Sequence, residues 1–194
     1  MSETKSNHAN VLQRNIDNDL SPQDRQMFDN ICGDFGIKIG FDGTWYYQGS
    51  PIGRLPLVKL FSTVLRKDAE GEYWLITPVE KGRIGVEDVP FVGVELTVEG
   101  SGPDLTLTLR TNLDDIVVLG PDHPLRVEED EESGEPRPYV RIRDNLDARL
   151  NRPVFYQLVD LGEEREIDGK TVLGVWSQHI FFPIGAILPG QSAG

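Results

Sequence analysis

The sequence contains two stretches that resemble copies of one unit. Residues 41–53 (FDGTWYYQGSPIG) and 111–123 (TNLDDIVVLGPDH) are each a short apolar run that ends in a small residue and a proline. Two further runs, YWLI and YVRI, match where Tyr73 and Tyr139 begin them. The remaining match is Pro90-Phe91-Val92 with Pro153-Val154-Phe155. A duplicated unit predicts two β-rich halves, and the interface between such halves is a common place for a ligand.

The spacing of polar and apolar segments predicts three regions along the chain. Residues 1–20 are polar and aperiodic, which is typical of a disordered tail. We expect an N-terminal α+β unit at residues 21–100 and a C-terminal β-rich unit at residues 103–190. Ser101-Gly102-Pro103-Asp104 is the expected joint, because Gly and Pro interrupt regular elements.

Short apolar runs separated by Gly and Pro predict antiparallel strands, and therefore an α+β fold made of two related β-rich units. Apolar residues at spacings of three and four predict a helix over about 56–67. The corresponding acidic segment of the second unit, residues 128–138, predicts a solvated loop. The other predicted elements are a short helix from Ser21 to Gly33, hairpin turns at Asp42-Gly43 and Asp168-Gly169, and strands that include Tyr73–Thr77, Arg83–Val86, Tyr139–Arg143 and Val154–Leu161.

The formal net charge is −13, from 32 acidic and 19 basic residues. Such a protein repels phosphate backbones, so we expect no general binding to nucleic acid. The single Cys32 allows no internal disulfide, and no Cys/His cluster predicts zinc or another cofactor. The N-terminus has no apolar signal segment, and Ile180–Leu188 is too short to span a bilayer. We therefore expect a cytoplasmic protein without membrane insertion.

Several cationic side chains are candidates for binding an anion. Tyr139, Arg141 and Arg143 alternate with apolar residues, which predicts one shared face of a strand. A ring beside two guanidinium groups suits stacking on a base and forked hydrogen bonds to phosphate. The alternative is that these arginines only offset the acidic segment before them. Arg54 and Arg126 occupy similar places in the two expected units, and Lys81 is a further candidate.

A catalytic site is not expected. Ser177 and His179 would share one face of a strand, but the sequence places no acid beside them to orient the imidazole. Gly169-Lys170-Thr171 lacks the earlier glycine of a phosphate-binding loop and predicts a hairpin turn instead. We therefore favour a protein that is not an enzyme, with a hydrolase using Ser177 and His179 as a remote alternative.

Five strings spread along the chain carry a resemblance to a known family. They are YYQGSPIGRLPLVKLF, ITPVEKGRIGVEDVPF, HPLRV, PYVRIRDNL and RPVFYQLV. Together they resemble domain-of-unknown-function family 1285 (DUF1285), a bacterial family, over about residues 20–188. The resemblance implies tandem β-rich units, the C-terminal one similar to pleckstrin-homology folds. It also implies a nucleotide-based ligand at the interface of the units and a role in signal transduction.

Two hypotheses for the function follow. The first is a sensor that binds a small phosphorylated, nucleotide-like ligand, with a signalling protein as its partner. Its expected ligand-binding residues are Arg54, Lys81, Arg126, Tyr139, Arg141 and Arg143. The second is a protein-interaction adaptor that engages a basic partner through the acidic segment 128–135 or through an exposed sheet edge.

Overall fold

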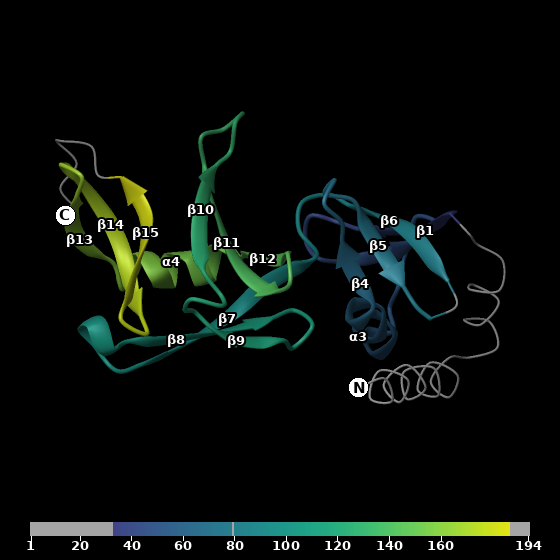
Figure 1. Ribbon diagram of the computed structural model, residues 1–194, viewed down its shortest axis with the longest axis horizontal. Coiled ribbons are helices and arrows are strands. Elements are labelled where there is room, and N and C mark those ends of the chain that lie inside the picture. The colour runs from purple at the N-terminus through teal and green to yellow at the C-terminus, as the bar shows by residue number, and fades with distance from the viewer. Residues whose placement is uncertain (1–32, 79, 187–194) are drawn as a thin grey trace, which may run out of the picture. The chain divides into compact units, whose positions relative to one another are not determined.

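The computed structural model describes residues 33–78 and 80–186 (Figure 1). The described residues divide into two compact units, one ending at Asp88 and the other beginning at Val89. The division falls between Asp88 and Val89, earlier than the predicted joint at residues 101–104, because β7 (Phe91–Glu99) pairs only with strands of the second unit. The predicted tail and the predicted helix from Ser21 lie outside the described residues.

The first unit is a six-stranded sheet with one helix. Strand β1 pairs with β6 in parallel, and every other neighbouring pair is antiparallel, in the order β3-β2-β1-β6-β5-β4. The strands are β1 (Gly33–Ile39), β2 (Trp45–Tyr47), β3 (Ser50–Pro51), β4 (Leu65–Lys67), β5 (Tyr73–Ile76) and β6 (Lys81–Val86). Helix α3 (Leu55–Thr63) connects β3 to β4.

Helix α3 covers the core of the first unit, and it ends earlier than predicted. Leu57, Val58 and Phe61 are buried, and the Phe61 ring lies 6.2 Å from the ring of Trp45. The predicted helix over 56–67 is therefore correct in kind. It stops at Thr63 because the following residues, Leu65–Lys67, take extended backbone to pair with β5.

The second unit begins with another six-stranded sheet, in the order β10-β11-β12-β7-β8-β9. Its strands are β7, β8 (Thr106–Thr111), β9 (Ile116–Val118), β10 (Leu125–Glu129), β11 (Pro136–Arg143) and β12 (Leu146–Leu150). A single 3-10 turn, η1 (Gly102–Asp104), precedes β8. Helix α4 (Arg152–Asp160) follows, and then a three-stranded sheet of β13 (Glu163–Ile167), β14 (Lys170–Ser177) and β15 (Ile180–Ala186).

The two six-stranded sheets have the same topology. In each, the first strand pairs with the second and, in parallel, with the sixth, while the third and fourth strands are the edges. Tyr73 and Tyr139 both lie on the fifth strand of their sheet, as the sequence match requires. The match of 41–53 with 111–123 is displaced by one strand, since it places β2 on β9. The match of residues 90–92 with 153–155 is wrong, because it places a strand on helix α4.

Helix α4 replaces a predicted strand. Residues 154–161 were expected to be extended because valine, phenylalanine and tyrosine favour strands. Instead, the Asn151 side chain accepts a hydrogen bond from the Val154 N–H at 2.9 Å and caps the helix, and Pro153 occupies its first turn. Val154 and Leu158, four residues apart, are both buried. A local cap and a helical apolar stripe therefore override the strand preference of the individual residues.

Both predicted hairpin turns are present. Asp168 and Gly169 have φ angles of 51° and 73° between β13 and β14, and Gly43 has a φ of 80° between β1 and β2. Left-handed backbone of this kind favours Gly and Asp. The acidic segment is less of a loop than predicted: residues 128–129 belong to β10 and 136–138 to β11, so only residues 130–135 form the turn of this projecting hairpin (Figure 1).

Candidate functional site

Three of the predicted binding residues meet on strands β10, β11 and β12. Arg126 on β10 is directly opposite Tyr139 on β11, and Arg141 is directly opposite Asp147 on β12. Residues that pair across neighbouring strands project from the same side of a sheet. The fold therefore gathers Arg126, Tyr139 and Arg141 around Asp147, and we call these four residues the arginine cluster.

Asp147 organises the arginine cluster. Its side chain is only 7% exposed, and one of its oxygens lies 3.0 Å from Nη1 of Arg126. The other oxygen accepts a hydrogen bond from Nε of Arg141. Arg141 also donates through Nη1 to the carbonyl of Asp144 at 2.9 Å. A single nearly buried carboxylate thus fixes two guanidinium groups.

The outer part of the arginine cluster faces water. The Arg126 and Arg141 side chains are 42% and 36% exposed, so part of each guanidinium fork is accessible. Nε of Arg126 also donates to Glu128 at 2.8 Å. Partial burial lowers the pKa of Arg126, but the hydrogen bond to Glu128 and the charge of Asp147 outweigh burial and raise it. Arg126 therefore stays charged at every physiological pH.

Tyr139 does not present its ring to solvent. It is 3% exposed, and the guanidinium carbon of Arg126 lies 4.7 Å from its ring centroid. The stacking face predicted for a base is used by the protein's own arginine. A planar ligand at this place would therefore meet the guanidinium plane of Arg126 first.

Arg143 is separated from the arginine cluster, contrary to the shared face that alternation predicted. The register between β11 and β12 shifts between Arg141 and Arg143, so strict alternation is lost there. Arg143 instead lies 2.9 Å from Asp115 and 4.9 Å from the ring centroid of Phe91. The shift lies where β11 turns into β12, and strict alternation along β11 does not predict it.

Arg54 and Lys81 lie in the first unit. Arg54 precedes helix α3 and its carbonyl accepts the first helical hydrogen bonds, while Nζ of Lys81 lies 4.1 Å from the ring centroid of Trp74. Arg54 is not the counterpart of Arg126. That counterpart is Lys67, which stands opposite Tyr73 on the fourth strand of its sheet, 5.2 Å from the ring centroid. The match of Tyr73 with Tyr139 is the sequence feature that points to Lys67.

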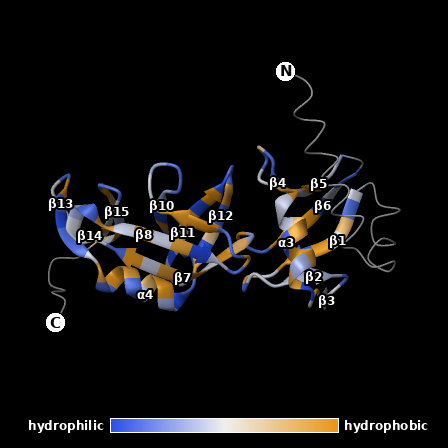
Figure 2. Ribbon diagram, turned by 90° about the horizontal axis from the view of Figure 1, so that it is seen from below, coloured by the Kyte–Doolittle hydropathy of each residue, from blue (hydrophilic) through white to orange (hydrophobic). Residues whose placement is uncertain are grey.

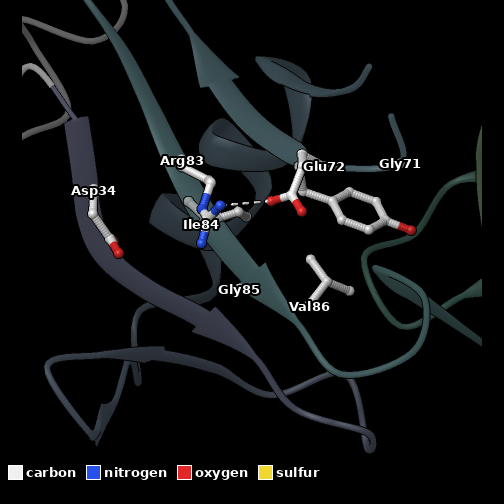
Figure 3. Close-up of a pocket in the computed structure, with 8 residues that line it drawn as sticks. Asp34, Gly71, Glu72, Arg83, Ile84, Gly85 and Val86 are labelled. Carbon is white, nitrogen blue, oxygen red and sulfur yellow. Dashed lines mark ion pairs between the residues drawn. The ribbon is translucent and has the colours of Figure 1, made fainter. Parts of the chain in front are cut away.

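The first unit also has a surface pocket of about 280 Å³ between β1, β5 and β6 (Figure 3). Arg83 lies in its centre and makes an ion pair with Glu72 at 3.1 Å. Asp34 faces the pocket from β1, and its carboxylate accepts a hydrogen bond from the Gly36 N–H at 2.8 Å. With two carboxylates against one guanidinium, this pocket is less suited to an anion than the arginine cluster.

Ser177 and His179 do not form a catalytic pair. Ser177 is fully buried, donates to the Leu119 carbonyl at 2.7 Å and accepts from the Leu107 N–H at 3.1 Å. His179 lies in the turn between β14 and β15 with a φ of 62°, not on the strand face that was predicted. The serine hydroxyl therefore links β14 to β8 and to the residue that follows β9. It is not placed to act as a nucleophile.

The described residues contain neither a metal-ion cluster nor a membrane-spanning helix. Within residues 33–78 and 80–186, no three His, Cys, Asp or Glu side chains are placed to hold a metal ion. In the same part of the chain, no helix is long and apolar enough to cross a bilayer.

The fold and the arginine cluster define a protein of two tandem β-rich units, the second with cationic side chains held on its sheet. Family models for the N-terminal and C-terminal domains of DUF1285, both described as being of unknown function, match residues 26–89 and 90–184. The chain therefore belongs to the DUF1285 family, as its sequence resemblance indicated. The boundary between the two matches agrees with the division of the structure into units.

Two solved structures are similar to this chain. A DUF1285 family protein from Silicibacter pomeroyi DSS-3 is 44% identical, with a TM-score of 0.73, over 80% of this chain and 82% of that one. A DUF1285 family protein from Shewanella baltica OS155 is 28% identical, with a TM-score of 0.50, over 64% of this chain and 90% of that one. No curated protein matches this chain.

Proposed function

We propose that this protein binds a small phosphorylated, nucleotide-like ligand without catalysis, and that the binding serves signal transduction. The observation that carries the proposal is the pair of partly exposed guanidinium groups fixed by Asp147. The ligand would be held by Arg126 and Arg141 on the second unit. A pleckstrin-homology-like character of this unit is part of the proposal, and a six-stranded sheet followed by a helix supports it.

The chemistry of the arginine cluster favours phosphate over other anions. Each guanidinium is a planar fork of donors, and the two forks match the several oxygens of a diphosphate or triphosphate. Asp147 and Glu128 accept from Nη1 and Nε of Arg126, and Asp147 and the Asp144 carbonyl accept from Nε and Nη1 of Arg141, which leaves Nη2 of both groups to donate to a ligand. Because Asp147 holds both side chains in place, a ligand loses less affinity to ordering them.

The surrounding charge gives the site selectivity for small ligands. The whole chain carries −13, so a large polyanion is repelled before it reaches the two arginines. A small phosphorylated molecule has fewer charges to be repelled. Its affinity should fall as salt is added, since the arginines are partly exposed.

The test is a thermal-shift series with ATP, GTP, cyclic dinucleotides and inorganic pyrophosphate, with adenosine as the uncharged comparison. A ligand present at one hundred times its Kd stabilises the folded protein by about 2.7 kcal/mol. We expect phosphate-bearing ligands to raise Tm and adenosine to leave it unchanged. A flat response to all phosphate-bearing ligands would contradict the proposal.

A matched pair of variants locates the response. Arg141→Gln removes one cation from the arginine cluster, and Arg110→Gln removes one from β8 of the same unit, where Arg110 is paired with Glu95 and Asp114. Each variant is compared with its own ligand-free Tm. We expect Arg141→Gln to lose the ligand response and Arg110→Gln to keep it. Equal loss in both variants would show that only net charge matters.

A second candidate function, an adaptor for a basic protein partner, is supported by the sheet edge β13. All five residues of this strand are exposed, and three of them are glutamates. Replacing Glu164 and Glu166 with glutamine should weaken binding to a basic strand-forming peptide while leaving the nucleotide response intact. An unchanged peptide affinity would remove this candidate.

A further inference from the structure

A pair of aromatic rings lies on one face of the three-stranded sheet, on strands other than those of the arginine cluster. Trp176 on β14 is directly opposite Phe181 on β15. Their ring centroids are 5.3 Å apart with an interplanar angle of 65°, an edge-to-face arrangement. Both residues are only partly buried. In such a pair, the negative face of a ring is available to a cation.

Glycine at position 174 is required for this arrangement. A Cβ atom there would overlap Cζ of Phe181, so no other residue fits beneath the ring without displacing it. Phe181 therefore lies across β14 beside Trp176. The two rings together form a platform rather than two isolated side chains.

A cation already rests on the platform. The guanidinium carbon of Arg165, on β13, lies 5.0 Å from the ring centroid of Trp176 and 5.4 Å from that of Phe181. The indole N–H of Trp176 donates to Glu163 at 3.1 Å, which fixes the ring and places a carboxylate beside it. Two aromatic faces and a carboxylate are the groups that recognise organic cations.

We propose that Trp176, Phe181 and Glu163 form a binding site for an arginine side chain of a basic protein partner, which Arg165 occupies in the unbound protein. Arg165 is itself exposed and comes from an edge strand whose residues are all exposed, so it can leave without unfolding the sheet. The strand is hydrophilic along most of its length (Figure 2) and holds Glu163, Glu164 and Glu166, which attract a cation.

How strongly Arg165 competes with an added guanidinium follows from the strength of its exposed contact with the rings. An exposed cation–aromatic contact favours the occupied state over the open state by about two- to fivefold. The apparent affinity for an added guanidinium is reduced by the open fraction, so removing Arg165 should raise it about three- to sixfold.

The experiment follows the three indole N–H resonances by NMR while N-acetyl-arginine amide is added to the wild type and to Arg165→Ala. The Trp176 signal is assigned with Trp176→Phe, and the methyl signals of Val175, a fully buried residue of β14, report an intact fold of the second unit. N-acetyl-citrulline amide, which has the same shape without the charge, is the matched control.

We expect N-acetyl-arginine amide to move the Trp176 signal about three- to sixfold more steeply in Arg165→Ala than in the wild type, and citrulline to move it in neither. If the Trp176 signal of Arg165→Ala does not respond while the Val175 methyl signals are unchanged, Arg165 only packs on the sheet and the proposed site does not exist. An equal response to citrulline would also overturn it, because charge would then play no part.

Discussion

Replacing Asp147 with asparagine removes one negative charge from a nearly buried position and keeps the volume and shape of the side chain. In the wild type, this carboxylate holds Arg126 at 3.0 Å and also accepts from Arg141. In the Asp147→Asn variant, two guanidinium groups share a position without their common anion. The variant should therefore lose both charge-assisted hydrogen bonds and gain repulsion between two like charges.

The loss of stability in Asp147→Asn can be bounded from the burial of the three side chains. Removing one partner of a fully buried ion pair costs about 3–5 kcal/mol. The carboxylate is 7% exposed but the arginines are 42% and 36% exposed, so water recovers part of the loss. We expect about 2–3 kcal/mol less stability, with each kcal/mol lowering Tm by about 4 °C for a unit of this size.

Urea unfolding followed by circular dichroism measures the loss, with Glu128→Gln as its control. That variant makes the same chemical change in another partner of Arg126, but the Glu128 side chain is 56% exposed. Exposed ion pairs contribute about 0–1 kcal/mol. If Asp147→Asn and Glu128→Gln destabilise equally, the idea that Asp147 organises the cluster is wrong.

Three further predictions concern the scaffold. Ser177→Ala should cost about 1–3 kcal/mol in urea unfolding, because it leaves buried backbone groups without a partner; a loss below that range would contradict the structural role. Gly93→Ala should lower the free energy of unfolding by about 1–3 kcal/mol, since its Cβ would lie 2.6 Å from Cδ2 of Leu150. A crystal structure of the variant in which no neighbouring side chain has moved would contradict this prediction. Hydrogen bonds from the backbone N–H and hydroxyl of Ser133 hold the pKa of Asp130 below its ordinary value. The ionised group therefore stabilises the fold above about pH 4 and this contribution is lost as pH falls through the lower, folded pKa. Asp130→Asn should flatten the acid limb of a pH–stability curve below about pH 4, and an unchanged limb would count against it.

Local chemistry explains which parts of the fold were predictable. Asp42-Gly43 and Asp168-Gly169 require left-handed backbone in their own turns, so the hairpins could be placed from adjacent residues alone. Helix α4 was missed although Asn151 and Pro153 signal its start. The residues after them favour strands individually, and only the cap and the burial of Val154 settle the matter.

The candidate site was predictable in composition but not in arrangement. Charge and alternation predict Tyr139 and Arg141, and the matching place of Arg54 in the first unit predicts Arg126; the fold brings the three together. Their common partner Asp147 was not found, because its role depends on pairing between β11 and β12. The separation of Arg143 depends on a shift in the same pairing. Both features depend on the register of the β11–β12 pair, which alternation along a single strand does not give.

The parallel pairing of the first and last strands has a consequence for synthesis of the chain. Asp34 on β1 pairs with Arg83 on β6, so β1 cannot complete its pairing in the N-terminal sheet until nearly fifty more residues have been translated. At about 5–20 residues per second, this interval lasts a few seconds. During that time the edge of β1 that later pairs with β6 has backbone N–H and C=O groups without strand partners. A nascent chain stalled before residue 81 should therefore be an aggregation-prone substrate for chaperones, whereas one stalled well beyond residue 86 should not.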